Sequence, residues 1–200
     1  MVRNLVFDFG KVLVECSTAS LLEDLIADSE ERQRFSELVN SSEFLDVFDL
    51  GELTFDEMAS VFSLKYPRWG AYFKPFLDRQ IEVVKREVPG MRDILCRLKS
   101  EGYHLYGLTN WGVVVRNVIR KFEILQLLDG CVISSEEHII KPDVAIYGRL
   151  CCRFSLSPEE CLFTDDKSAN VDAAISFGMD AVVFRNASEF EADLKTRGII

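Results

Sequence analysis

The sequence predicts a three-layer α/β fold, in which a parallel sheet has helices on both faces and an all-helical segment interrupts it after the first strand. Three observations predict this fold. Residues 2–7 form a short apolar run typical of a buried parallel strand. From about residue 18 to residue 87, apolar residues recur at the three- and four-residue spacing of helices. From Pro89 onward, strand-like and helix-like runs alternate with short connections, which is the pattern of a parallel sheet covered on both faces.

The helical insertion is expected over residues 16–88, with residues 1–15 and 89–200 forming the core. Within it, LLEDLIADSEERQRFSELV places apolar residues at helical spacing. Gly51 interrupts this pattern, and Thr54 with Glu57 predicts a capping box for the helix TFDEMASVFSLKY. Pro67 ends that helix. A further helix is expected to run to Val88, and no strand is expected in the insertion.

The second part of the core follows Pro89-Gly90 as a regular alternation. The predicted helices are MRDILCRLKSEG, WGVVVRNVIRKFEIL, PDVAIYGRLCCRF and KSANVDAAISFG. The predicted strands are YHLYGL, GCVIS, CLFT and AVVF. The length of 200 residues suits one domain, or a core with a modest insertion.

Composition excludes several classes of protein. The chain has 33 acidic and 23 basic residues, so its net charge of −10 disfavours binding to nucleic acid. No apolar stretch is long enough to cross a membrane, and the N-terminal apolar run is too short for a signal peptide. The six cysteines lack metal-binding spacing, so we expect reduced thiols in a cytoplasmic protein of unknown oligomeric state.

Polar residues follow the carboxyl ends of the predicted strands, where parallel sheets bind their ligands. Any single one of them could be a helix cap, but complementary groups from four strand ends are harder to explain by capping. Lys141 is expected after a fourth candidate strand. The full set is Asp8, Thr109, Asn110, Lys141, Asp165 and Asp166.

The charges of this set indicate its chemistry. Asp8, Asp165 and Asp166 would repel one another strongly, and Lys141 balances only one of them. A divalent cation with a preference for oxygen ligands, Mg²⁺, would relieve the repulsion. Together with Lys141 it would hold a phosphoryl group, and one carboxylate would remain as the nucleophile. The residues therefore predict magnesium-assisted phosphoryl transfer through an aspartate.

Four segments resemble, in order, the motifs of the haloacid dehalogenase superfamily. VFDFGKVLVE resembles the first motif, LTN the second, KPD at Lys141 the third, and FTDDKSANVDAA the acidic fourth. The resemblance covers essentially the whole chain. It implies a Rossmann-like core with a helical (C1-type) cap between the first two motifs.

The resemblance also implies roles for individual residues. Asp8 would attack phosphorus and bind Mg²⁺, Thr109 and Lys141 would bind the phosphoryl group, and Lys141 would also offset the charge of Asp8. Asp166 would be the main acidic metal ligand of the fourth motif. Asp165 would bind the metal through water or as the alternative ligand. In addition, Asn170 would orient the site and Asn110 would shape the pocket.

Gly10 departs from the family pattern, because the family's phosphatases place a second aspartate at this position as general acid and base. The backbone carbonyl of Gly10 can still reach the metal, whereas the proton transfer is lost. The DxG pattern resembles a subgroup of sugar-phosphate phosphatases that includes glucose-1-phosphate phosphatases. Lys11, which is also a candidate phosphate-binding residue, or a group from the cap could assist instead.

Two other functions remain open beside a phosphatase acting on a small phosphorylated metabolite. A hydrolytic dehalogenase shares the fold and the nucleophile but needs no metal. A catalytically silent module that binds a phosphorylated ligand is compatible with Gly10. Trp111 is a candidate pocket wall, and His104 and His138 are expected to be structural or exposed. Cap residues that could select the substrate are Glu43, Phe44, Phe48, Lys65, Trp69 and Tyr72.

Overall fold

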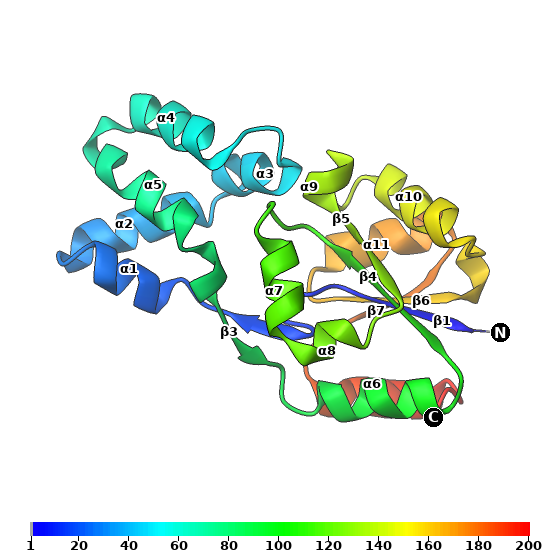
Figure 1. The fold of residues 1–200 in the computed structure, drawn as a ribbon. Coiled ribbons are helices and arrows are strands. Elements are labelled where there is room, and N and C mark those ends of the chain that lie inside the picture. The colour runs from blue at the N-terminus through cyan, green and yellow to red at the C-terminus, as the bar shows by residue number, and fades with distance from the viewer. Residues whose placement is uncertain (1) are drawn as a thin grey trace.

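The central sheet is parallel, and its strands lie in the order β5-β4-β1-β6-β7 in the computed structural model, which describes residues 2–200 (Figure 1). Asn4 of β1 pairs with His104 of β4 on one side and Cys161 of β6 on the other. All carboxyl ends therefore meet at one edge. The strands are β1 (Asn4–Phe7), β4 (His104–Thr109), β5 (Gly130–Ile133), β6 (Cys161–Asp165) and β7 (Asp180–Val183).

Helices cover both faces of this sheet, which confirms the predicted three-layer fold. Alternate residues of β1 point to opposite faces, so Leu5 and Phe7 belong to one buried apolar cluster and Val6 to the other. The first face is covered by α6 (Met91–Ser100), α7 (Val115–Lys121), α8 (Glu123–Gln126) and α12 (Ala187–Thr196). The second is covered by α10 (Val144–Phe154) and α11 (Ser168–Phe177), while α9 (Ser134–Glu137) follows β5 directly.

The insertion extends from the core as a separate group of helices, at the upper left of Figure 1. The predicted capping box is present, since Thr54 and Glu57 exchange side-chain and backbone hydrogen bonds at the start of α4. Buried rings such as Phe35, Phe44 and Phe73 fill the centre of the group. Its elements are α1 (Ala19–Leu25), α2 (Ser29–Val39), α3 (Ser42–Leu50), α4 (Phe55–Lys65), η1 (Pro67–Trp69), α5 (Gly70–Asp78) and η2 (Gln80–Val83).

The expectation of a helix running to Val88 is wrong. Residues 84–87 form strand β3 (Val84–Glu87), which pairs antiparallel with β2 (Val14–Cys16). Val84 is buried while Lys85 and Arg86 are exposed, so a strand buries its apolar residue and leaves its charges in water. This two-stranded ribbon carries the chain into and out of the insertion.

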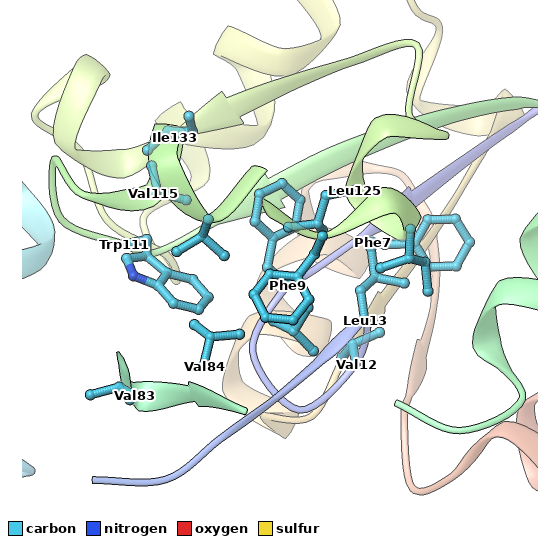
Figure 2. Packing of buried hydrophobic residues seen from close by; sticks show 14 of the residues in the cluster. Phe7, Phe9, Val12, Leu13, Val83, Val84, Trp111, Val115, Leu125 and Ile133 are labelled. Atoms are coloured by element: carbon cyan, nitrogen blue, oxygen red, sulfur yellow. The ribbon is translucent and has the colours of Figure 1, made fainter. Parts of the chain in front are cut away.

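Apolar packing joins the ribbon to the core and fixes the loop after β1. Figure 2 shows Val83 and Val84 beside Trp111, with Phe9 packed deeper in the same cluster. A Cβ atom on Gly107 would lie 2.5 Å from the Phe9 ring, so β4 needs glycine at this point. The segment that follows Asp8 is therefore held against the sheet. None of the helices in residues 2–200 combines the length and hydropathy that a membrane crossing requires.

Candidate active site

A cavity of about 250 Å³ lies where the carboxyl edge of the sheet meets the insertion. The core contributes the charged floor of this cavity, and α3 of the insertion contributes part of its cover. The core residues that line it include Asp8, Gly10, Lys11, Asn110, Trp111, Lys141, Asp166, Lys167 and Asn170, and those of α3 are Phe44, Leu45, Phe48 and Asp49.

Lys141 is the centre of the charged floor. Its Nζ lies 3.0 Å from Oδ1 of Asp8 and donates to Oδ2 of Asp165 at 2.6 Å. It also donates to the carbonyl of Leu108 at 2.8 Å, so each of its three donors has a partner. Burial alone would lower the pKa of Lys141, but Asp8 and Asp165 outweigh it and raise the pKa above its ordinary value. Lys141 therefore stays charged inside the protein.

The expected strand before Lys141 is absent from the structure. Between the end of β5 and Lys141 lie α9 and a short loop, so a strand end does not position the lysine. Asn110 does so instead: its Oδ1 accepts from the Lys141 backbone N–H at 2.8 Å, and its Nδ2 donates to the Lys141 carbonyl at 2.9 Å. Because Asn110 follows β4, this pair of hydrogen bonds ties the loop that contains Lys141 to the edge of the sheet.

Asp165 and Asp166 have different surroundings, although they are adjacent at the end of β6. Asp165 is fully buried, and its oxygens accept hydrogen bonds from Lys141, from Nδ2 of Asn170 at 3.0 Å and from the backbone N–H of Lys167 at 2.9 Å. Asp166 lines the cavity, and its Oδ2 lies 3.3 Å from Nζ of Lys11. Asp166 is thus the accessible member of the pair.

Three carboxyl groups meet beside Lys141. Asp8, Asp165 and Asp166 each have one carboxyl oxygen at this point, and these oxygens lie within 4.8 Å of one another. Burial, with repulsion from Asp165, raises the pKa of Asp8 to about 6, although Lys141 opposes the shift. Clustered carboxylate oxygens are the ligands that Mg²⁺ prefers, and a cation would relieve their repulsion. The donor set therefore fits a divalent metal ion.

Thr109 ends β4 beneath the cavity. Its side chain is fully buried, and its Oγ1 is one of three buried side-chain oxygens without a hydrogen-bond partner in residues 2–200. Thr109 and Asp165 are not among the residues that line the cavity. An unpartnered hydroxyl at the carboxyl end of β4 has unused capacity to bind an oxygen-rich ligand.

Gly10 leaves open space beside the nucleophile candidate. A Cβ atom at this position would meet only the Trp111 ring, at 3.9 Å. Lys11 follows in a left-handed conformation, with φ of 61°, and its side chain is 70% exposed. The cavity therefore has an unfilled volume at Gly10 and an exposed cation at its edge.

The aromatic and charged residues of the insertion divide into two groups. Phe44 and Phe48 line the cavity, as does Trp111 from the core. The remaining four residues, Glu43, Lys65, Trp69 and Tyr72, do not line it and contact other residues of the insertion. Glu43 pairs with Lys65 at 2.8 Å, Trp69 donates to Glu31 at 2.8 Å, and the Tyr72 ring packs against Phe35.

The two histidines are not part of the cavity. His104 is exposed at the start of β4, with its Nδ1 3.8 Å from Asp129. His138 hydrogen-bonds through its Nδ1 to the carbonyl of Leu50 at 2.9 Å. That bond has a structural role, because it ties the end of α3 to the core.

Asp49 is the acidic residue of the cavity lining that the sequence did not single out. It is half-buried in the last turn of α3, and its carboxyl group forms no hydrogen bond or ion pair with any other of residues 2–200. Burial raises the pKa of Asp49 to about 7, with Asp8 adding repulsion and Lys167 opposing the shift. The sequence does not distinguish it from Asp46, because only the docking of α3 places Asp49 over the site.

The docking of α3 rests on three contacts with the core. Oγ of Ser134 donates to the carbonyl of Asp49 at 2.6 Å and accepts from the Trp111 backbone N–H at 2.9 Å. His138 binds the Leu50 carbonyl, as described above. The Phe48 ring packs so closely on Gly112 that a Cβ atom there would lie 2.7 Å from it. The end of α3 is thus fixed over the cavity.

Comparison with known proteins gives a family match over most of the chain. The sequence model of the haloacid dehalogenase-like hydrolase family matches residues 2–178. This range contains β1 through α11 and all residues of the charged floor.

Individual relatives include both phosphatases and dehalogenases. The chain is 30% identical to a glyceraldehyde 3-phosphate phosphatase of Pyrococcus furiosus over 70% of this chain and 60% of that protein. It is 28% identical to a chloroplast flavin mononucleotide hydrolase of Arabidopsis thaliana over 55% of this chain and 45% of the relative. An (S)-2-haloacid dehalogenase of Burkholderia cepacia is 28% identical over 54% of this chain and 48% of its own length. Each match thus spans less than two thirds of the relative.

Solved structures share the fold over nearly their whole length. A predicted hydrolase of this type from Porphyromonas gingivalis superposes with a TM-score of 0.76 at 21% identity, covering 98% of both chains. An enzyme of the same family from Bacteroides thetaiotaomicron, solved with magnesium and inorganic phosphate, gives a TM-score of 0.74 at 18% identity, covering 93% of this chain and 96% of that one. At these identities the likeness shows the shared fold.

Proposed function

Because the chain belongs to the haloacid dehalogenase-like hydrolase family, we propose that it is a magnesium-dependent phosphatase acting on a small phosphorylated metabolite, with a sugar phosphate as the expected class. One observation carries the proposal: Asp8, Asp165 and Asp166 gather around one point beside the buried Lys141. Such a site handles a charged phosphoryl group locally, on a chain whose net charge is −10. We expect the enzyme to work in the cytoplasm.

Asp8 is the proposed nucleophile. It lies directly after β1, lines the cavity and keeps one contact to Lys141, so its free oxygen is available for in-line attack on phosphorus. Lys141 stays protonated and holds Asp8 in place. Its positive charge would attract the oxygens of the phosphoryl group, and the unpartnered hydroxyl of Thr109 would bind one of them as charge moves onto them. The product of the first step is a phosphoryl group on Asp8, which water then removes.

Mg²⁺ would be held by Asp8, Asp166 and the backbone carbonyl of Gly10, with Asp165 as the more remote acid. When bound, it supplies positive charge that draws in the phosphoryl oxygens and offsets the repulsion of the carboxylates. The buried hydrogen bonds of Asp165 suit a supporting role, since Lys141, Asn170 and Lys167 already occupy its oxygens. Asn170 in this way orients Asp165 rather than binding the substrate.

The insertion, residues 16–88, is proposed to be the cap that selects the substrate, with its helices ending before strand β3. Phe44 and Phe48 from the insertion and Trp111 from the core surround the space above Asp8 with apolar surface. Asn110 and Lys11 add polar groups at its sides. A cavity of about 250 Å³ suits a small metabolite better than a polymer.

Hydrolytic dehalogenation is the second candidate, because haloacid dehalogenases are among the relatives. That reaction would place the carbon skeleton of a haloacid on Asp8 and would need no metal. The arrangement of the acids favours the phosphatase: a metal-independent reaction gives no reason to place the accessible Asp166 beside Asp8.

Phosphate release distinguishes these functions. The purified protein is incubated with sugar phosphates, nucleotides and an activated aryl phosphate, each with Mg²⁺ or with EDTA, and halide release is measured from 2-haloacids in parallel. We expect phosphate release that EDTA abolishes, and no halide. Metal-independent halide release would identify a dehalogenase. Silence toward every substrate, with a phosphate analogue such as vanadate still bound, would identify a silent ligand-binding module.

A further inference from the structure

The proposed reaction needs a proton at a place where Gly10 offers none. When the bond from phosphorus to the substrate oxygen breaks, an alkoxide leaves, and alkoxides of sugars and other alcohols leave slowly unless they are protonated. The volume beside Asp8 at Gly10 contains no side chain, and a Cβ atom there would touch only Trp111. The proton donor must therefore come from another wall of the cavity.

Few of the titratable residues that line the cavity are free to donate a proton. Asp8 is the nucleophile, and Lys141 spends all three of its donors on Asp8, Asp165 and the Leu108 carbonyl. Asp166 pairs with Lys11 and is a proposed metal ligand. Burial raises the pKa of the Cys16 thiol to about 12, so it is a weak acid at neutral pH.

Asp49 is the carboxyl group that remains. It lines the cavity from the insertion, across from the floor that contains Asp8 and Gly10, and no other group in residues 2–200 occupies its oxygens. Its backbone is fixed, because its carbonyl accepts from the buried Ser134 and the next carbonyl from His138. The glycine after α3, Gly51, packs against Ser135 so closely that a Cβ atom would clash at 2.4 Å. The backbone that carries the Asp49 side chain is therefore held in place over the cavity.

The surroundings of Asp49 favour its protonated form at moderate pH. It sits in the last turn of a helix, where backbone carbonyls disfavour negative charge. Asp8 on the floor and Asp46 on the same helix repel its carboxylate, while Lys167 and Lys141 attract it. Burial is the largest effect, and the pKa of Asp49 lies at about 7, where a group can both give and take a proton.

We propose that Asp49 is the general acid and then the general base of the reaction, supplied by the insertion in place of a side chain at residue 10. The inference rests on the proposed phosphatase function and deepens it. It also makes the docking of α3 a requirement for chemistry, because a displaced insertion removes the proton donor from the site.

The proposed reaction has two steps. In the first, an oxygen of the Asp8 carboxylate bonds to phosphorus, the bond from phosphorus to the substrate oxygen breaks, and protonated Asp49 gives that oxygen its proton. The alcohol leaves, and Asp49 is ionised. In the second, Asp49 takes a proton from water as the water oxygen bonds to phosphorus, and the bond from phosphorus to Asp8 breaks. Inorganic phosphate leaves, and both aspartates regain their starting states.

The test compares Asp49→Asn with the wild type and with Asp46→Asn, an exposed aspartate on the same helix. We expect Asp49→Asn to lower kcat/KM for alkyl phosphates by roughly 10²–10⁴-fold and for p-nitrophenyl phosphate by less than about tenfold, since nitrophenolate needs no proton to leave. In the second step the lost base should produce a burst of nitrophenol followed by slow turnover. Asp46→Asn keeps the Asp49 carboxyl group and removes a weaker repulsion on it than that of Asp8, so its activity should stay close to that of the wild type in both assays.

A rescue experiment and a pH profile complete the test. Gly10→Asp, for which the cavity has space, should restore part of the alkyl-phosphate activity to Asp49→Asn. The wild-type kcat/KM for alkyl phosphates should fall as pH rises through about 7, and this fall should be absent in Asp49→Asn. Equal losses for good and poor leaving groups, or no loss, would overturn the role of Asp49 while leaving the phosphatase standing. A wild type that releases no phosphate would overturn the proposed function itself, and the role of Asp49 with it.

Discussion

At the scale of single residues, the site depends on one buried cation that balances two buried or half-buried acids. Lys141 contacts both Asp8 and Asp165, and its side chain is 1% exposed. Charges removed from water are tolerated only when each is paired, and the loss of one partner leaves the others uncompensated. Lys141 therefore contributes to the stability of the fold as well as to the proposed binding of phosphate.

Lys141→Met should lower the free energy of unfolding by about 3–5 kcal/mol in the absence of metal, because Asp8 and Asp165 lose their shared partner. Urea unfolding in EDTA measures the change. Lys195→Met is the matched control: Lys195 is 55% exposed in a surface pair with Glu191, and its loss should cost at most about 1 kcal/mol. Similar effects of the two substitutions would contradict the account of Lys141.

The raised pKa of Asp49 predicts that the contribution of this residue to the stability of the fold falls as pH rises. The folded-state pKa of about 7 lies above the ordinary value of 3.8, so folding favours the protonated form. The stability that this gives is complete below about pH 4 and is lost as pH rises through about 7. Asp49→Asn should therefore gain stability relative to the wild type between pH 4 and pH 8. Chemical unfolding of both proteins across this range measures the gain. If their free energies of unfolding change with pH in the same way, the raised pKa of Asp49 is contradicted.

At the scale of elements, the sequence predicted most of the core because its signals there are local. The alternation of strands and helices after Pro89, the capping box at Thr54 and the segments at the carboxyl edge all follow from short-range patterns. Strand β3 at residues 84–87 could not be predicted from short-range patterns. It exists only through pairing with β2, about seventy residues earlier in the chain. Lys141 was likewise expected after a strand, whereas Asn110 from a distant loop positions it.

The contact of α3 with α9 (Ser134–Glu137) can be tested with a pair of glycines. Gly51 and Gly102 both have positive φ, at 63° and 90°, but a Cβ atom on Gly51 would lie 2.4 Å from Ser135, whereas one on Gly102 would meet nothing within 4 Å. Both alanine variants bear the cost of the left-handed conformation, about 1 kcal/mol. Gly51→Ala should lose a further 1–3 kcal/mol or so from the clash and should also raise KM.

Thermal unfolding and steady-state kinetics of the two glycine variants separate these effects. If Gly51→Ala matches Gly102→Ala in stability and leaves KM unchanged, the end of α3 is not fixed by this contact.

At the scale of the whole molecule, the floor of the site and its cover depend on different features of the sequence. The meeting of Asp8, Thr109 and Asp166 at the carboxyl edge could be predicted from sequence, because the sheet topology brings strand ends together. The cover of the site could not, because it depends on which face of α3 meets the core. Phe44, Phe48 and Asp49 line the cavity, whereas Trp69 and Tyr72, equally suitable by residue type, pack within the insertion.

Metal binding should be visible in the stability of the whole protein. A cation that binds only the folded state stabilises it by mass action, by about 2.7 kcal/mol at a concentration 100 times its Kd. We expect Mg²⁺ to raise Tm above its value in EDTA, and Asp166→Asn to lose most of this rise, because Asp166 is the accessible acid. Sodium chloride at matched ionic strength is the control. An equal Tm in all three solutions would contradict a metal site.

The central claim is that Asp8 accepts a phosphoryl group, and trapping that group tests it most directly. The protein is mixed with Mg²⁺ and the best substrate found, quenched in acid within one turnover, digested and analysed by mass spectrometry. We predict a phosphoryl group on the peptide that contains Asp8. It should be absent in EDTA and in Asp8→Asn, which should remain folded while turnover falls by roughly 10³-fold or more. An unmodified Asp8 during rapid turnover, or full activity in a folded Asp8→Asn variant, would contradict the account.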